Sequence, residues 1–427
     1  MKRLAFAAAL LVGCSSGSSP APVDEAPPAG ELSADDESGD AYDPYDPMGK
    51  ADGYQLPKGP VKFTTACDKG DRVVIAAVGD VLLHGPLQTQ AVTATNRFRS
   101  LWSDVEGLLG KADLTYANLE GPTAAGVDAY GKEVKDPGFK FDGVVYTSYP
   151  QFNYHPSLVD DLLTTGVDVV STANNHALDR RWLGVDKTLG VLEAAGMAHT
   201  GTHASAALEG SWHTLTESAG FRLAWLSCTY ATNGIPDTKK QVLNCTSQAS
   251  EIETMVSGLA ADPSIDAVIV TPHWGVEYSA NPASPEIKLG HRWLEAGATA
   301  IIGSHPHVLQ PWEKYVTQDG RETFAIYSLG NFVSGQSQLA RRSTLLLYLG
   351  MTRGQDGKVR INGVRYVPLC MTKQNGRLGV APVDAVSGLQ ESRALTVKMF
   401  GLWNLMTPTE ALVTTPQCDP NWTPPAK

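Results

Sequence analysis

The chain has 427 residues and a formal net charge of -11, and 42% of its residues are hydrophobic, including 9 Trp and 14 Tyr. This length and composition allow one large or two smaller domains with a sizeable core. Ten acidic residues and one lysine lie between Ala21 and Asp52, so much of the charge is local and the rest of the chain is close to neutral. There is no basic footprint for nucleic acid, and we expect none as a partner.

The first residues resemble an export signal. Met1-Lys2-Arg3 is positively charged, Leu4 to Val12 is apolar but too short to span a bilayer, and Leu11-Val12-Gly13-Cys14 resembles a bacterial lipobox. We expect residues 1–14 to be a lipoprotein signal peptide with lipidation at Cys14. The protein would then be exported and anchored to a membrane of the cell envelope, outside the cytoplasm. An ordinary secretory signal with a chance cysteine is the alternative.

The next segment has the composition of a linker. Ser15 to about Tyr54 is rich in Ser, Pro, Gly and acidic residues and has almost no large aliphatic residues. Such a segment cannot bury enough apolar surface to fold by itself. We assign residues 15–66 to a disordered acidic spacer and residues 67–427 to the folded domain. An acidic tail that binds a partner is the alternative.

The cysteines suggest two disulfides, which an exported protein permits. Cys228 and Cys245 bracket a loop with several turn residues, and we expect them to be joined. Cys67 and Cys418 flank the two ends of the folded region and could pair. Cys370 lies in an apolar run, so we expect a buried free thiol. The sequence contains no C-x-x-C, which leaves a zinc ribbon or a thioredoxin-type motif unsupported.

From Arg72 onward, short apolar runs that predict strands alternate with stretches of helical spacing. The predicted strands are Val73–Val78, Asp113–Ala117, Val167–Thr172, Asp266–Val270 and Ala300–Gly303, and the predicted helices are Arg97–Leu109, Pro156–Thr165, Leu178–Ala195, Gln248–Leu259 and Glu286–Ala296. Gly121–Tyr154 reads as a long polar loop. Trp212–Leu215 and Arg222–Ser227 predict a hairpin that turns at Ala219-Gly220. Four strands follow, at Trp312–Thr317, Thr323–Leu329, Thr344–Gly350 and Val359–Leu369. This order favours an α/β fold with helices outside.

Five of these strands end in side chains that can bind metal ions. The candidate ligands are Asp80, Glu120, Asn175, His273, and His305 with His307. In open α/β sheets, ligands bind at the carboxyl ends of strands, so distant loops can meet at one rim. Singly, each has an ordinary explanation: Asp80 could cap a helix, Glu120 could belong to a turn, and His273 could pack on Trp274. Together they indicate a two-metal hydrolase.

Six motifs follow one another between Val73 and Phe332. They are Gly79-Asp80, Asn118-Leu119-Glu120-Gly121-Pro122, Asn174-Asn175-His176, His273-Trp274-Gly275-Val276-Glu277-Tyr278, Gly303-Ser304-His305-Pro306-His307-Val308-Leu309-Gln310 and Ser328-Leu329-Gly330-Asn331-Phe332. In this order and spelling they resemble the CapA family of bacterial capsule and poly-γ-glutamate synthesis proteins, which is similar to the calcineurin-like metallophosphatases. The resemblance implies a four-layer α/β/β/α sandwich of metallophosphatase type. It also implies a rim with two divalent metal ions (Mn, Fe or Zn).

The resemblance also implies a role for each candidate. Asp80 and His307 would bind the first metal, Glu120 would bridge both, and Asn175, His273 and His305 would bind the second. His176 would be the general acid or a transition-state stabiliser, although a buried core histidine is the ordinary explanation. The chain departs from the D-x-H motif of metallophosphatases, because the next histidine after Asp80 is His84, and Glu120 stands where Asp is usual. Both departures weaken the first metal site.

Several neighbours are candidates for a supporting role. Asn118, Asn174 and His84 lie beside the ligands in the sequence, and Glu277 could orient His273 or simply pack in its loop. Arg341, with Arg342, could clamp an anionic group or form an exposed charge pair.

The resemblance implies an envelope-anchored protein of capsule or poly-γ-glutamate synthesis or export. It would hydrolyse phosphoester or polymer bonds with the help of metal ions, and its partner would be an anionic polymer or a phosphoester substrate. The alternative is a non-catalytic component that binds or helps to export the polymer. No G-x-S-x-G, P-loop or G-x-G-x-x-G motif supports another enzyme class.

Overall fold

The computed structural model describes residues 56–57, 59–207 and 210–425, all of which belong to one compact unit within Tyr45–Lys427. The predicted signal segment, Cys14 and most of the predicted spacer lie outside the described residues. The predicted spacer boundary at residue 66 is too late, because Val61, Phe63 and Ala66 are buried. The folded unit therefore includes the residues just before Cys67.

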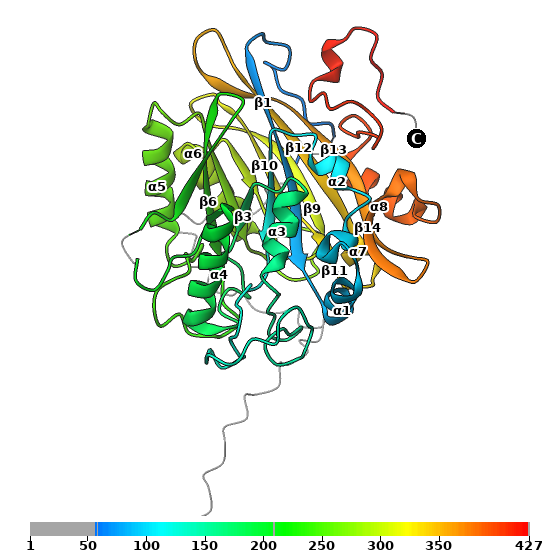
Figure 1. Cartoon of the computed structure of the whole chain (residues 1–427). Coiled ribbons are helices and arrows are strands. Elements are labelled where there is room, and N and C mark those ends of the chain that lie inside the picture. Colours follow the sequence, from blue (N-terminus) through cyan, green and yellow to red (C-terminus); the bar gives the residue numbers. More distant parts are fainter. Residues whose placement is uncertain (1–55, 58, 208–209, 426–427) are drawn as a thin grey trace, which may run out of the picture. The chain divides into compact units, whose positions relative to one another are not determined.

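The first sheet has the order β14-β13-β12-β1-β2-β3-β4, with β11 beside the end of β1 (Figure 1). Its strands are β1 (Asp71–Leu82), β2 (Leu114–Leu119), β3 (Val169–Ser171), β4 (Ala198–Thr200), β11 (Asn331–Ser334), β12 (Ser343–Arg353), β13 (Val359–Gln374) and β14 (Arg377–Pro382). The strands β1 to β4 are parallel, whereas β12, β13 and β14 pair antiparallel. The carboxyl ends of β1, β2 and β3 therefore lie at one edge.

The second sheet has the order β5-β6-β7-β8-β10-β9. Its strands are β5 (His213–Ser218), β6 (Phe221–Thr229), β7 (Ala267–His273), β8 (Ala300–Ile302), β9 (Leu309–Val316) and β10 (Glu322–Leu329). The strands β6, β7, β8 and β10 are parallel. The predicted hairpin at Ala219-Gly220 is confirmed as β5–β6, and both turn residues have a positive φ, as two-residue hairpin turns require.

The helices are α1 (Gly85–Thr93), α2 (Glu106–Leu109), α3 (Ser157–Thr164), α4 (Arg181–Ala195), α5 (Ala249–Ala261), α6 (Ser284–Ala296), α7 (Leu339–Arg342) and α8 (Gln390–Phe400), with short 3-10 turns η1 (Arg97–Leu101), η2 (Val383–Ala385) and η3 (Pro416–Cys418). The helices α1 to α4 pack on the outer face of the first sheet and α5 and α6 on that of the second, whereas Phe400 of α8 joins the cluster between the sheets. In Figure 1, α3 and α4 lie in front of the strands and α5 lies at the left.

Three hydrophobic clusters separate the layers. One lies between the two sheets and joins Ile75 of β1 to Trp225 of β6 and Ile269 of β7. A second packs α3 and α4 on the first sheet, for example through Leu158 and Leu189. The third packs α5 and α6 on the second sheet. The predicted α/β sandwich with helices outside two sheets is therefore confirmed. Because both faces of β1 and β2 are covered, Ile75–Leu82 and Leu114–Leu119 are buried without a break rather than at every second residue.

One predicted helix is wrong. Arg97–Leu109 divides into η1 and α2, and the backbone between them is not helical at Trp102 (φ -140). The cause is tertiary: the indole of Trp102 is buried and donates to Thr165, and the backbone N–H of Phe98 donates to Asp161. The apolar residues with helical spacing in this segment are buried, but two short helical elements joined by a turn bring them to the core. The helices α1 and α8 and the short strands β4, β11 and β14 were not predicted.

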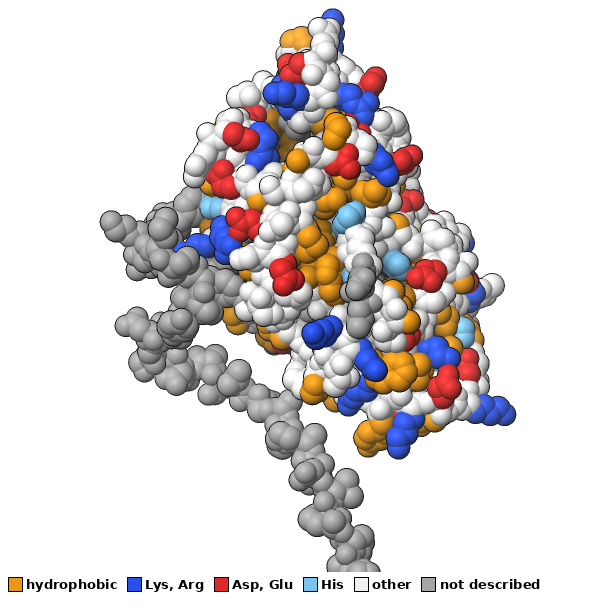
Figure 2. All heavy atoms as spheres, turned by 90° about the vertical axis from the view of Figure 1, so that its left-hand side faces the viewer, with side chains coloured by type: hydrophobic (Ala, Val, Ile, Leu, Met, Phe, Trp, Pro, Cys, Tyr) orange, Lys and Arg blue, Asp and Glu red, His pale blue; other side chains and the backbone are white. Residues whose placement is uncertain are grey.

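The cysteines pair as the sequence suggested. Cys67 is joined to Cys418 and Cys228 to Cys245, and Cys370 is a buried free thiol. The first disulfide ties the entry of the folded unit to its last turns. Among the described residues, no helix is long and apolar enough to cross a membrane. On the face of the molecule in Figure 2, acidic and basic side chains are interspersed among hydrophobic ones, so the described residues there form no broad field of one sign.

Candidate metal centre

The six predicted ligands meet where the carboxyl ends of the two sheets come together. Asp80 lies in β1, Glu120 directly follows β2, and Asn175 follows β3, all in the first sheet. His273 ends β7 of the second sheet, and His305 and His307 follow β8. All six side chains belong to residues that are at most 3% exposed. Neither sheet alone holds the whole set.

Asp80 is part of this cluster and does not cap a helix. It lies where the pairing of β1 with β2 and β11 shifts register, so the strand bends at this point. Its Oδ1 accepts a hydrogen bond of 2.8 Å from the side-chain amide of Asn118. Its Oδ2 lies 3.1 Å from Nδ1 of His307. Asn118 thus contacts Asp80, and Asp80 contacts the histidine with which the resemblance grouped it.

Glu120 is the most unusual group of the site. Its carboxylate is completely buried, yet neither oxygen accepts a hydrogen bond from a described residue. Oε1 lies 3.7 Å from Nε2 of His273 and 3.8 Å from Nε2 of His307, so two imidazoles from the opposite sheet face it at more than hydrogen-bond distance. Buried carboxylates without partners are rare because desolvation is costly. This arrangement leaves room for a cation between the carboxylate and the rings.

His273 joins the ligands of the predicted second metal. Its Nε2 lies 3.0 Å from Oδ1 of Asn175 and 3.2 Å from Nδ1 of His305. Its Nδ1 lies 2.9 Å from the hydroxyl of Ser304 and 3.2 Å from the amide of Asn118. Ser304 and Asn118 therefore fix the ring and direct Nε2 at the other ligands, as outer partners of metal-binding histidines commonly do. The residues that orient His273 were not identified as such from the sequence.

Burial and the charges within the cluster set its protonation. Burial lowers the pKa of His273 and of His305 well below the ordinary value, and the neighbouring imidazoles add to the effect. Burial also lowers the pKa of His307, but the carboxylates of Glu120 and Asp80 outweigh it and raise this pKa to about 9. Burial, and next the charge of Asp80, raise the pKa of Glu120 well above its usual range. Neutral imidazoles bind metals, and a bound cation would favour the ionised carboxylates.

The residues present therefore fit divalent metal ions. Carboxylate oxygens, imidazole nitrogens and one amide oxygen are typical ligands of Mn, Fe and Zn. Among the described residues, two groups have ligand atoms within 4.8 Å of one another: Asp80, Glu120 and His273 in one, and Glu277, His305 and His307 in the other. The first consists of predicted ligands, whereas the second includes a residue that we had assigned to another role.

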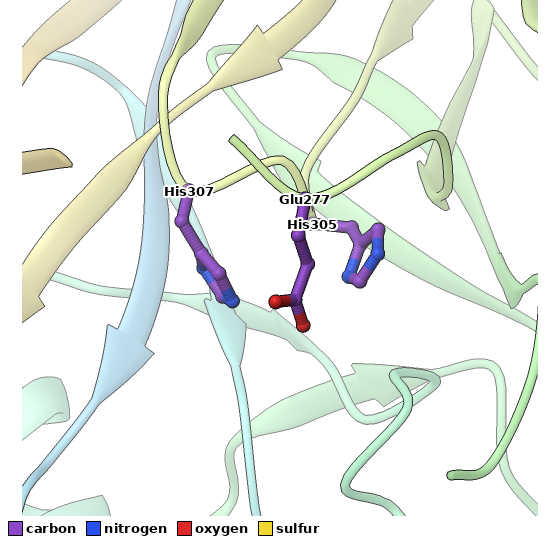
Figure 3. A group of neighbouring side chains, drawn as sticks. All are labelled: Glu277, His305 and His307. Carbon is purple, nitrogen blue, oxygen red and sulfur yellow. The ribbon is translucent and has the colours of Figure 1, made fainter. Parts of the chain in front are cut away.

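Glu277 lies beside other residues than the one with which the sequence had associated it. We considered that it could orient His273, but the described contacts of His273 go to Ser304, Asn118, Asn175 and His305. Figure 3 shows the carboxylate of Glu277 between the rings of His305 and His307, with all three side chains pointing the same way. The physical reason is the turn at Gly275 (φ 94), which carries the chain from the end of β7 over the histidine loop.

His176 has a buried partner that the sequence reasoning missed. Its Nδ1 lies 2.7 Å from Oδ2 of Asp179, and its ring packs edge-on against Phe152. The backbone N–H of Phe152 donates to the same carboxylate oxygen at 2.6 Å. The His-x-x-Asp spacing in a turn was the available signal. Asn174 donates to the backbone carbonyl of Leu119 at 2.8 Å and so ties the loop of His176 to β2.

The remaining candidates lie around this cluster. Nδ1 of His84 accepts a hydrogen bond of 3.1 Å from the backbone N–H of Gly335, and His84 belongs to neither metal-ligand group. The guanidinium of Arg341 lies 3.4 Å from the ring centre of Tyr278, which neighbours His307. Arg342 instead contacts the thiol of Cys370, so the two arginines are not an exposed charge pair. Of these two arginines, Arg341 is the one that lies near the ligand groups, through Tyr278.

Asn331 is a further residue that sequence reasoning did not assign to the site. Its Oδ1 lies 3.0 Å from Nδ1 of His307, and its amide donates to the backbone carbonyl of Arg341 at 2.9 Å. Its place in the last motif was the available signal. Both loop histidines have a positive φ, 102° at His305 and 57° at His307. Such strain typically costs about 1–3 kcal/mol per residue and is concentrated at functional sites.

Comparison with known proteins shows the family of the chain. The family pattern described as "Bacterial capsule synthesis protein PGA_cap" matches residues 74–336, more than half of the chain. The chain is 26% identical over 288 residues to "PGA biosynthesis protein CapA" of Bacillus subtilis (strain 168), covering 67% of this chain and 70% of that protein. It is also 26% identical over 286 residues to "Capsule biosynthesis protein CapA" of Bacillus anthracis, covering 65% and 64%.

Likeness to solved structures is more distant. The NAD nucleotidase NadN of Haemophilus influenzae shares 12% identity at a TM-score of 0.43, over 79% of this chain and 57% of that chain. A putative 5′-nucleotidase of Staphylococcus aureus shares 11% identity at a TM-score of 0.41, over 78% and 59%. The present chain thus spans little more than half of each nucleotidase. At these TM-scores the likenesses carry no property over to this chain.

Proposed function

Because the chain belongs to the family of bacterial capsule synthesis proteins, we propose that it is a metal-dependent hydrolase of phosphoester or polymer bonds in capsule or poly-γ-glutamate metabolism. The observation that carries the proposal is the buried carboxylate of Glu120, which lacks hydrogen-bond partners and faces two imidazoles. A structural carboxylate would have partners, whereas a metal-bridging one is completed by the ions it binds.

The chain's own residues supply the rest of the chemistry. When bound, divalent cations would supply positive charge at the scissile group and activate the attacking water. Asp179 holds Nδ1 of His176 and leaves Nε2 as the atom that can give a proton to the leaving oxygen. Arg341, which lies over the ring of Tyr278, would attract an anionic substrate. Water would add across the ester bond, and the leaving group would depart protonated.

The test is hydrolysis of bis(p-nitrophenyl) phosphate by the full-length chain loaded with Mn²⁺ or Zn²⁺. We expect turnover by the wild type, and a decrease in Asp80→Ala, which removes a ligand. The control is His213→Ala, because His213 lies on the edge strand β5 and bonds to Ser211 away from the site. Equal activity in Asp80→Ala and the wild type would contradict a role for the cluster in hydrolysis.

A second candidate function is binding or export of the anionic polymer without turnover. The position of His84 favours it. Nδ1 of His84 accepts a hydrogen bond from the backbone N–H of Gly335, and β1 contains no histidine that could take the place of the one in D-x-H. A loaded chain that retains metal, hydrolyses no tested ester and binds poly-γ-glutamate in a titration would support this function. A loaded chain that hydrolyses an ester would exclude it.

We further propose that the protein is anchored at the cell envelope through a lipid on Cys14. The support is the sequence alone, a charged start followed by an apolar run and Leu11-Val12-Gly13-Cys14. Labelled palmitate should enter the wild type and remain absent from Cys14→Ser when both are expressed in a bacterium. Equal membrane association and no label in either chain would contradict the anchor.

A further inference from the structure

The loop between β7 and α6 presents a carboxylate to the two loop histidines. Glu277 is exposed to solvent, whereas His305 and His307 are buried. One carboxylate oxygen and one ring nitrogen from each histidine lie within 4.8 Å of one another. In Figure 3 the carboxylate lies between the two rings, the geometry of three ligands around a shared centre.

The backbone holds Glu277 in this position. The N–H of its neighbour Tyr278 donates to the carbonyl of Pro306, between the two histidines, at 2.8 Å. The side chain of Gln310 donates to the carbonyl of Ser279 at 2.9 Å, just after Tyr278. Positive φ angles at Gly275 and Tyr278 shape the turn. The loop of Glu277 is therefore fastened to the loop of its partners, which distinguishes Glu277 from a freely placed surface acid.

The charges at this position also call for a cation. Three carboxyl groups, those of Asp80, Glu120 and Glu277, belong to the two ligand groups of the cluster. An anionic substrate would be repelled by the site without further positive charge. A divalent cation bound to Glu277 removes this conflict.

We propose that Glu277, His305 and His307 form the outer of two cation positions, in which Glu277 is a direct metal ligand. The inner position is formed by Asp80, Glu120 and His273. Two imidazoles and one carboxylate are a common ligand set for Zn, Mn and Fe. The inference rests on the proposed metal function, and it adds a ligand that the sequence motifs did not assign.

The experiment measures metal binding rather than activity. Full-length wild type, Glu277→Gln and Glu277→Asp would be stripped with chelator and titrated with Mn²⁺ by calorimetry, and metal content would be measured by mass spectrometry. Glu133→Gln is the matched control, because Glu133 is also an exposed carboxylate, lies in the loop 121–154 and pairs with Lys187 of α4. We expect two ions per chain in the wild type and the control. In Glu277→Gln, one ion should be lost or bound at least about tenfold more weakly.

The possible outcomes separate this inference from the proposed function. Partial recovery of the weaker ion in Glu277→Asp, together with an altered visible spectrum of bound Co²⁺ in Glu277→Gln, would support direct ligation. Two ions with unchanged affinity in Glu277→Gln would overturn the inference and leave the metal function intact. A wild type that binds no Mn²⁺ or Zn²⁺ would overturn both. Equal melting temperatures of the stripped wild type and Glu277→Gln would show that any loss of metal is not a loss of folding.

Discussion

At the scale of single residues, the buried carboxylate of Glu120 is the strongest sign of a metal site. Burial of a carboxylate without hydrogen-bond partners costs free energy, and in this chain the carboxylate also lies near that of Asp80. Two buried acids side by side destabilise a metal-free fold, because like charges disfavour ionisation of both. The folding of the chain and the loading of the site are therefore linked. Removal of the charge at position 120 should have opposite effects with and without metal.

We predict that Glu120→Gln is more stable than the wild type in chelator and less stable in excess Mn²⁺. The folded apo chain keeps a proton on Glu120 that the unfolded chain releases above the ordinary pKa of glutamate. The stability of the wild type therefore falls as the pH rises through that region, and the variant avoids this loss, on the order of 1–3 kcal/mol. Melting temperatures from pH 5 to 8 test this. A variant less stable than the wild type at every pH in chelator would contradict it.

His176 and Asp179 give a prediction that depends on the leaving group. If Nε2 of His176 protonates the leaving oxygen, His176→Ala should slow alkyl esters by about 10²–10⁴-fold and p-nitrophenyl esters much less. Asp179→Asn should weaken the same step, because a neutral amide oxygen is a weaker acceptor than a carboxylate for the hydrogen bond from Nδ1–H of His176. Steady-state kinetics on both ester types would check this. Equal losses on both would contradict proton donation and leave His176 a charge stabiliser.

The sequence allowed prediction of ligands at strand ends but not of partners across the two sheets. Asp80, Glu120 and His273 each follow or end an apolar run, so their place at one rim follows from strand polarity. The contact of Ser304 with His273 depends on how the second sheet packs on the first, which no local pattern encodes. The same holds for Glu277, whose direction is set by one turn at Gly275.

At the scale of elements, the bend of β1 positions the first ligand. A Cβ added at Gly79 would lie 1.8 Å from the carbonyl oxygen of Gly330, so the two segments can approach only because residue 79 is glycine. The neighbouring Asp80 lies opposite Asn331 in this close pairing. The close approach of β11 to β1 therefore determines the positions of both Asp80 and Asn331, which contacts His307.

We predict that Gly79→Ala lowers stability by about 1–3 kcal/mol and weakens metal binding, because β11 must move away from β1. The matched control is Gly190→Ala in the interior of α4, where a Cβ meets nothing within 4 Å. Alanine there should raise stability by roughly 0.5–1 kcal/mol and leave metal binding unchanged. Chemical denaturation and calorimetry would test both. A tolerated Gly79→Ala with full metal affinity would contradict the role of this bend.

The long loop 121–154 shows what composition alone misses at this scale. Its polar, Gly-rich sequence correctly predicted the lack of regular elements. It is nevertheless pinned by the buried Arg180, which donates to the carbonyls of Val127 and Val145 and to the hydroxyl of Thr147. Arg180 directly follows Asp179, so the loop and the partner of His176 are held by adjacent residues. A side chain that satisfies distant carbonyls leaves no periodic signal in the sequence.

At the scale of the whole molecule, the Cys67–Cys418 disulfide joins the two ends of the folded unit across 351 residues. A cross-link over a long stretch removes more conformational entropy from the unfolded chain than one over 17 residues, as in Cys228–Cys245. We predict that Cys67→Ser with Cys418→Ser lowers stability by roughly 2–5 kcal/mol. Metal content should not change, since Cys67 precedes the amino end of β1 and Asp80 lies near its carboxyl end. A melting temperature of the double serine variant equal to that of the wild type would contradict this.

The two sheets together form the site, so the central claim is that this shared rim binds divalent metal ions. The most direct measurement is the metal content of the full-length chain after loading with Mn²⁺ or Zn²⁺ and removal of free ions, compared with His273→Ala. The account predicts two ions per chain in the wild type and a loss in the variant, which removes the histidine that faces Asn175, His305 and Glu120. A wild type that retains neither metal after loading would contradict it.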